Sequence, residues 1–199
     1  TAINLAASWA LMKRRVCLVD CDPQGNATTG SGLHLDATRP TLNELLLGLA
    51  PVEQVLWQTR FGFDLLPSNQ DLTVAEVRLL QQAGCEKALA RALEPLIAQY
   101  QVIVIDTPPT LNLLTVNALA AADAVIIPVQ CEYFALEGLA GLLNSIEQMR
   151  QSVNPTLKIG GIVRTLFDGR NRLTQEVSEQ FITQLGSCVY HSIIPRNVR

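Results

Sequence analysis

The sequence predicts an α/β domain of three layers, with helices on both faces of a mostly parallel central sheet. Short apolar runs alternate with segments of helical period along the 199 residues. The runs are apolar throughout, as expected of parallel strands buried on both faces. Strands separated by helices imply right-handed crossovers, which place the helices against the sheet.

Five segments have the strand pattern and seven have the helix pattern. The predicted strands are 15–20, 101–106, 124–129, 157–163 and 189–194, and the predicted helices are 1–13, 41–47, 72–82, 86–99, 113–121, 135–151 and 173–185. Thr41, followed by Glu44 three residues later, has the form of a capping box at a helix start. Because there are no internal repeats and no linkers, we predict one domain over residues 1–199.

Composition excludes several classes of protein. The 48% hydrophobic content argues against a disordered chain. No apolar run approaches the roughly 20 residues that span a bilayer, and residues 1–13 lack the layout of a signal peptide. Five scattered cysteines without a C-x-x-C pair do not indicate zinc binding or redox chemistry. We therefore expect a cytoplasmic protein without a membrane partner.

Charge is distributed unevenly along the chain. The net charge of −3 argues against a uniformly basic surface for nucleic acid. Residues 1–156 carry nine Lys or Arg against fifteen Asp or Glu, whereas residues 157–199 carry six against three. Any contact with a polyanion is therefore expected near the C-terminal end.

The segment VDCDPQGN (19–26) places two carboxylates at the end of a predicted strand. Ligands of open α/β sheets collect at this edge. Residues two apart on a strand project the same way, so Asp20 and Asp22 address one site if the extended geometry persists. An ordinary Asx-rich turn after a strand explains the Pro and Gly equally well.

The segment VIVIDTPPT (102–110) has the form of a Walker B strand. Four apolar residues end in Asp106, and in nucleotide-binding proteins such a carboxylate helps to hold magnesium. One carboxylate is sufficient, because Mg²⁺ usually keeps several of its waters. Pro108 and Pro109 stiffen the following loop. The motif alone is weak, but its pairing with VDCDPQGN is much stronger.

Three stretches of the sequence resemble consecutive blocks of the ParA/Soj family of deviant Walker A partitioning ATPases. They are 1–33 (TAINLAASWALMKRRVCLVDCDPQGNATTGSGL), 102–139 (VIVIDTPPTLNLLTVNALAAADAVIIPVQCEYFALEGL) and 193–199 (IIPRNVR). The resemblance implies a P-loop NTPase-like fold and ATP hydrolysis with Mg²⁺. It also implies a glycine-rich phosphate-binding loop directly upstream of Thr1, so we expect a domain truncated at both ends and inactive alone.

The same resemblance implies roles for individual residues. Asp22 matches the carboxylate that positions or activates the attacking water, Asp20 lies beside the magnesium shell and contacts it through water, and Asp106 matches the Walker B ligand. Two further groups are implied to contact the nucleotide: Thr107, Pro108 and Pro109 at the γ-phosphate, and Pro195 and Arg196 beside adenine.

The resemblance also implies partners. Family members close as ATP-dependent dimers that bind DNA non-specifically through arginines, and Arg170 and Arg199 match two of these. Arg172 stands where the family commonly has Asn and adds basic charge. Tyr133 and Phe134 either form a dimer or partner surface or fill the layer between sheet and helix. The basic C-terminal residues could also be an ordinary solvated face.

The leading interpretation is an ATP-driven chromosome or plasmid partitioning protein, associated with the nucleoid and released from DNA when a ParB-type partner stimulates hydrolysis. One alternative is a truncated interaction module that binds partners without nucleotide. Another is a MinD-like positioning ATPase of the membrane.

Lys13 stands where the family often ends its first helix with Gly, which implies a left-handed lysine at a cost of up to about 1 kcal/mol.

Overall fold

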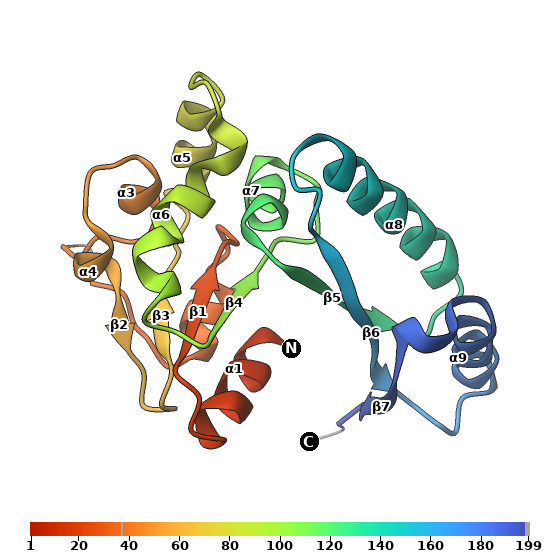
Figure 1. Cartoon of the computed structure of the whole chain (residues 1–199). Helices are drawn as coiled ribbons and strands as arrows, with labels where there is room; N and C mark the ends of the chain where they lie inside the picture. The colour runs from red at the N-terminus through yellow and green to blue at the C-terminus, as the bar shows by residue number, and fades with distance from the viewer. Residues whose placement is uncertain (37, 198–199) are drawn as a thin grey trace. The chain divides into compact units, whose positions relative to one another are not determined.

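The structure is a computed structural model that describes residues 1–36 and 38–197. The chain divides into two compact units, Thr1–Ala121 and Ala122–Arg199. Each unit is described by itself below, and the prediction of a single domain stays a prediction. Figure 1 gives the element labels.

Unit 1 contains a four-stranded sheet in the order β2-β3-β1-β4. Its central strand β1 pairs in parallel with β3 and β4, and only the short β2 is antiparallel to its neighbour. The elements in chain order are α1 (Ala2–Leu11), β1 (Val16–Asp20), α2 (Asn26–Gly30), α3 (Leu42–Leu46), α4 (Val52–Val55), β2 (Trp57–Gln58), β3 (Asp64–Leu66), α5 (Leu72–Leu79), the 3₁₀ turn η1 (Cys85–Lys87), α6 (Ala88–Ile97), β4 (Val102–Asp106) and α7 (Leu113–Ala121).

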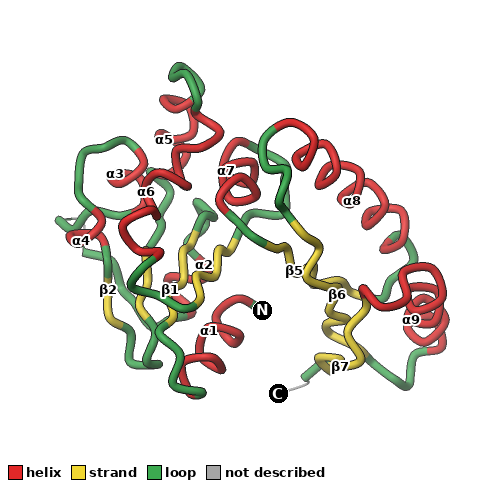
Figure 2. The backbone as a smooth tube through the Cα atoms, in the orientation of Figure 1, coloured by secondary structure: helices red, strands yellow, loops and turns green. Residues whose placement is uncertain are grey.

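Helices cover both faces of this sheet. Successive side chains of β1 point to opposite faces, and every residue of this strand is buried, so both faces are shielded from solvent. Cys17 and Val19 pack in one core with residues of α3, α4, α5, α6 and α7. Val16 and Leu18 pack in a second core with Ala6 of α1 and Ala27 of α2. Figure 2 shows α2 close to β1. Unit 1 therefore has the predicted three layers.

Unit 2 contains a parallel three-stranded sheet in the order β5-β6-β7. Its elements are β5 (Ala124–Gln130), α8 (Ala135–Ser152), β6 (Lys158–Phe167), α9 (Arg172–Leu185), the 3₁₀ turn η2 (Gly186–Cys188) and β7 (Val189–Pro195). Figure 1 shows α8 and α9 on the same side of this sheet.

The register between β6 and β7 is irregular. Ile162 faces Val189, but Arg164, two residues later, faces Ile193, so β7 carries extra residues that bulge from the ladder. Only Val189 of β7 is buried. The expectation that this strand is buried on both faces was therefore wrong, because β7 is an edge strand with an irregular ladder.

The predicted fold class is confirmed, although the strands are divided between two sheets. Thr41 and Glu44 form the predicted capping box at α3. Lys13 has a φ of 63°, as the family comparison implied. In the part of the chain that the structure describes, no helix combines the length and apolar character needed to cross a membrane.

Candidate functional site

The carboxyl ends of β1 and β4 lie side by side. The two strands are parallel, and Asp20 is the register partner of Asp106. The pairing continues one residue further, because the Cys21 amide donates to the carbonyl oxygen of Asp106 at 2.8 Å. The structure therefore brings the two predicted carboxylate motifs to one edge of the unit 1 sheet.

Asp20 is completely buried, and its carboxylate is occupied by protein donors. Oδ2 accepts hydrogen bonds from the amide and the hydroxyl of Thr28, both at 2.7 Å, and Oδ1 accepts from the Asp22 amide at 3.2 Å. Burial raises the pKa of Asp20, and the hydrogen bonds from Thr28 oppose that increase. Asp20 thus fixes the start of α2 against the end of β1.

The loop after β1 is held from a second side by Ser68. The Ser68 amide donates to the Thr28 hydroxyl at 2.9 Å, and the Ser68 hydroxyl donates to the Asp22 carbonyl at 2.8 Å. Gly25 has a φ of 63°, and a Cβ there would lie 2.9 Å from the Ser68 carbonyl oxygen. This position requires glycine for both reasons.

Asp22 is the half-buried carboxylate of the loop. Its Oδ1 accepts from the Gln24 amide at 2.9 Å, so the loop does contain the Asx turn that was the alternative interpretation. The turn does not exclude a catalytic role, because Oδ2 accepts no hydrogen bond from the described residues. A hollow of about 290 Å³ borders this loop, lined by Gln24, Thr29 and Ser68 among others.

Asp106 is half-buried, and within residues 1–36 and 38–197 its carboxylate makes no hydrogen bond. Burial raises its pKa, and the negative charges of Asp20 and Asp22 raise it further. A carboxylate oxygen of this kind fits Mg²⁺, which prefers oxygen ligands.

The described residues contain no set of three His, Cys, Asp or Glu side chains that could enclose a metal ion. Mg²⁺ usually keeps several of its waters and accepts one or two protein carboxylates, which a single strand-end carboxylate can supply. Asp106 is the residue that would hold such an ion. Asp20, whose oxygens are already occupied, would contact it only through water. When bound, Mg²⁺ neutralises the charge of the transferred phosphate.

The loop that follows β4 begins at this same edge. Thr107 and Pro109 are exposed and Pro108 is half-buried, so the loop lies open directly beyond Asp106. Its two prolines fix φ and limit its freedom.

The remaining predicted nucleotide residues lie in unit 2. Pro195 ends β7, and the Arg196 amide donates to the Phe167 carbonyl at 3.0 Å, which holds the end of β7 next to the end of β6. Both side chains are exposed.

Two of the three predicted DNA-binding arginines, Arg170 in the loop before α9 and Arg172 as its first residue, are strongly exposed. Arg170 forms an ion pair with Asp168, and Arg172 forms one with Glu176. Arg199 lies outside the described residues. Tyr133 and Phe134 are 74% and 72% exposed, so they do not fill the layer between sheet and helix. They border a hollow of about 520 Å³ between β5 and α8.

Comparison with known proteins identifies the family. A family model described as an AAA domain matches residues 1–159. The chain is 48% identical to the chromosome partitioning protein ParA of Myxococcus xanthus and 47% identical to the chromosome-partitioning ATPase Soj of Thermus thermophilus. All of the chain is aligned in both cases, with 71% and 76% of the respective relatives covered. The chain belongs to the ParA/Soj family of partitioning ATPases.

A solved structure agrees with the ParA/Soj fold. The Mycobacterium smegmatis protein described as cobyrinic acid a,c-diamide synthase, crystallised with an ATP analogue and magnesium, is 39% identical. Its TM-score is 0.91, and the alignment covers all of this chain and 80% of the other. The family and the fold class are thereby confirmed. The roles of individual residues stay predictions.

Residues that hold the Asp22 loop and the irregular β7 strand were not recognised in the sequence. Thr28 and Ser68 hold the Asp22 loop, and no local pattern marks either of them. Arg164 on β6 is 93% buried and has no carboxylate partner among the described residues. It donates to the Ser178 hydroxyl at 2.7 Å and to the carbonyls of Tyr190 and His191 at 2.9 and 3.1 Å. It therefore satisfies carbonyl groups at the bulge of β7.

Proposed function

We propose that the protein is an ATP-dependent DNA-partitioning switch of the cytoplasm and nucleoid. In this proposal the ATP-bound form is a homodimer that binds DNA without sequence preference. Hydrolysis, stimulated by a ParB-type partner, releases it. Membership of the ParA/Soj family supports the proposal.

The observation that carries the proposal is that Asp20 and Asp106 are register partners at one edge of the unit 1 sheet, with Asp22 two residues beyond Asp20 and near enough for its charge to raise the pKa of Asp106. Phosphoryl transfer needs positioning and charge neutralisation more than covalent chemistry. Asp106 has a carboxylate that makes no hydrogen bond with the described chain and suits Mg²⁺. Asp22 keeps one carboxylate oxygen for a water, on a loop that Asp20 and Ser68 hold in place.

Five further residues are proposed to contact the nucleotide. Thr107, Pro108 and Pro109 would sense the γ-phosphate from the loop beyond Asp106. Pro195 and Arg196 would contact the adenine. Asp20 would act through a water of the magnesium shell while it fixes the loop.

DNA binding is assigned to Arg170, Arg172 and Arg199. Arginine on phosphate gives affinity without sequence reading, and this affinity falls steeply with salt. The exposure of Arg170 and Arg172 supports the assignment. The exposed Tyr133 and Phe134 fit a protein-contacting surface, since aromatic residues are enriched in interfaces.

The test is ATP turnover of the intact gene product, with and without non-specific DNA and over a range of salt. We expect slow hydrolysis that DNA increases and high salt returns to the DNA-free rate. Asp22→Ala should reduce turnover on the order of 10²-fold or more while nucleotide still binds. Glu53→Ala, which removes an exposed carboxylate of α4, is the matched control. Unchanged turnover in Asp22→Ala would refute the catalytic assignment.

A further inference from the structure

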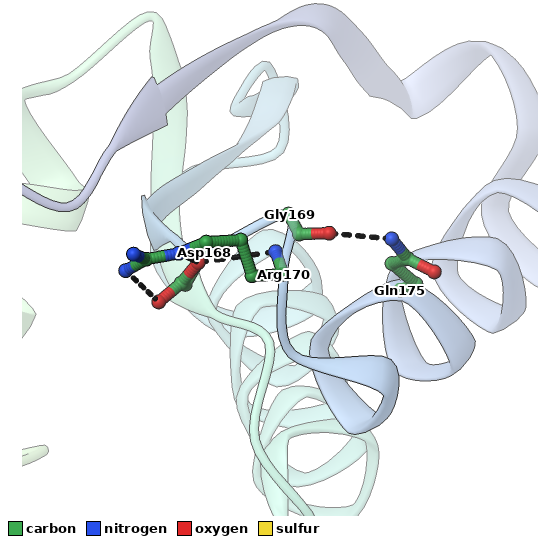
Figure 3. Close-up of polar contacts among 4 residues, drawn as sticks. All are labelled: Asp168, Gly169, Arg170 and Gln175. Carbon is green, nitrogen blue, oxygen red and sulfur yellow. Dashed lines mark hydrogen bonds and ion pairs between the residues drawn. The ribbon is translucent and has the colours of Figure 1, made fainter.

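Arg170 is held in one orientation by the residue two positions before it. Figure 3 shows the Asp168 carboxylate facing the Arg170 guanidinium. Oδ1 accepts from Nε at 3.0 Å and from the Arg170 amide at 3.1 Å, and Oδ2 accepts from Nη2 at 3.0 Å. A two-point pair of this kind fixes the plane of the guanidinium as well as its position.

The backbone of the same loop is also fixed. The Gln175 side-chain amide donates to the Gly169 carbonyl, as Figure 3 shows. The Asn171 side chain caps α9 by accepting from the Leu173 amide at 3.0 Å. Asp168 thus attaches the guanidinium to a loop that α9 already holds.

The pair leaves Arg170 able to bind another anion. A guanidinium has five N–H donors, and Asp168 uses one on Nε and one on Nη2. Three donors on Nη1 and Nη2 remain. The side chain of Arg170 is 84% exposed, whereas that of Asp168 is 29% exposed. Two of these donors can therefore meet a phosphate while Asp168 stays in place.

Asp168 is fully ionised at neutral pH. Its hydrogen bonds with Arg170 lower its pKa to about 2, and the nearby charge of Arg196 contributes in the same direction. The carboxylate therefore holds Arg170 throughout the physiological range.

Arg172 provides a contrast within the same surface. Its Nε donates to Glu176 Oε1 at 2.7 Å, which is the only hydrogen bond between the two side chains in the described structure. Glu176 lies one turn further along α9, and both side chains are exposed. Such a pair holds a side chain weakly. Asp168 and Glu176 thus bring the same charge to the surface but hold their arginines differently.

We propose that Asp168 is a positioning residue that presents Arg170 to a nucleic-acid phosphate, an inference that rests on the proposed DNA binding. Ordering a long side chain on binding costs about two- to tenfold in affinity, and Asp168 removes part of that cost beforehand. The negative charge of Asp168 repels the phosphate and so acts the other way. At physiological ionic strength the screening length is about 8 Å, and we expect this repulsion to weaken binding by no more than roughly twofold. Positioning therefore prevails over repulsion.

The experiment measures binding of the ATP-loaded intact gene product to a non-specific DNA duplex. Asp168→Ala should weaken binding about two- to tenfold, although it removes a negative charge. Glu176→Ala, the matched control, removes the same charge and should bind equally or up to about twofold more tightly. In an Arg170→Ala background, Asp168→Ala should not weaken binding further, because Asp168 acts through Arg170; the loss of its charge should leave binding equal or up to about twofold tighter.

The outcomes separate the two proposals. If Arg170→Ala leaves DNA binding unchanged, the proposed DNA contact is wrong, and the positioning role is overturned with it. If Arg170→Ala weakens binding but Asp168→Ala does not, only the positioning role is overturned. An equal loss from Asp168→Ala with and without Arg170 would indicate a structural effect and also overturn it. Should Asp168→Ala unfold, Asp168→Asn, which keeps an acceptor for the Arg170 amide, should still bind more weakly than the parent.

Discussion

Replacing Thr28 by Val tests how the Asp22 loop is held. Thr28 is 2% exposed, and its hydroxyl donates to Asp20 Oδ2 at 2.7 Å and accepts from the Ser68 amide at 2.9 Å. Valine has nearly the same shape but replaces the hydroxyl with a methyl group. The substitution therefore removes both hydrogen bonds and leaves the backbone amide of Thr28 as a donor to Asp20.

The expected loss of stability follows from these two hydrogen bonds. A hydrogen bond to a charged group contributes about 1.5–3 kcal/mol, and a buried amide left without a partner costs about 1–3 kcal/mol. We expect Thr28→Val to lower the free energy of unfolding by about 3–5 kcal/mol. This is a large share of the roughly 5–15 kcal/mol that stabilises a typical domain.

Urea denaturation followed by tryptophan fluorescence measures this loss. The chain has two tryptophans, Trp9 and Trp57, and both lie in unit 1 with Thr28. Thr29→Val makes the same change at the next, exposed position of α2 and should cost less than about 0.5 kcal/mol. A loss for Thr28→Val within about 1 kcal/mol of the Thr29→Val value would refute the reasoning.

Two further predictions concern helix ends of unit 1. Lys13 has a left-handed φ of 63° after α1, so Lys13→Gly should raise the free energy of unfolding by about 0.5–1 kcal/mol in the same urea assay, whereas Lys13→Ala should not. Burial acts to raise the pKa of Glu44, but hydrogen bonds from Thr41 and Asn43 lower it overall. The lowered pKa contributes stability above the ordinary Glu range near 4.3, and this is lost as pH falls through the folded-state value. The stability difference between the parent and Glu44→Gln should therefore shrink from pH 7 to pH 3; a constant difference would contradict this assignment.

Hydrophobic periodicity predicted the longer elements of the fold well. The prediction for α7 matches both ends, and those for β1 and β4 begin one residue early. Periodicity needs several residues to be visible, so α2, with five residues, and β3, with three, were missed. Their positions depend on tertiary contacts, such as the parallel pairing of β3 with β1.

The candidate site could be predicted only in part, because sequence spacing shows which residues share an edge but not how they are used. The Asp-x-Asp spacing and the apolar run ending in Asp106 placed three carboxylates at the ends of two predicted strands, and the structure shows that these strands are neighbours. The contacts of Asp20 with Thr28, eight residues away, have no sequence signature. Asp168 could have been found, because an Asp two residues before an exposed Arg is a short local pattern. Nothing in the sequence reveals the two-point geometry of their pair.

Asp20 and Asp106 are carboxylates of two different kinds. Asp20 is buried and accepts three hydrogen bonds, which offset the cost of burying its charge and leave little capacity for a ligand. Asp106 lies beside that charge, and the described chain supplies no hydrogen bond in compensation. Asp20 therefore stabilises the loop through its hydrogen bonds. The uncompensated charge of Asp106 instead raises the free energy of the site, and binding of a cation would lower it. Asp20 thus contributes to the site twice, by fixing the Asp22 loop and by increasing the attraction of the Asp106 edge for a positively charged ion.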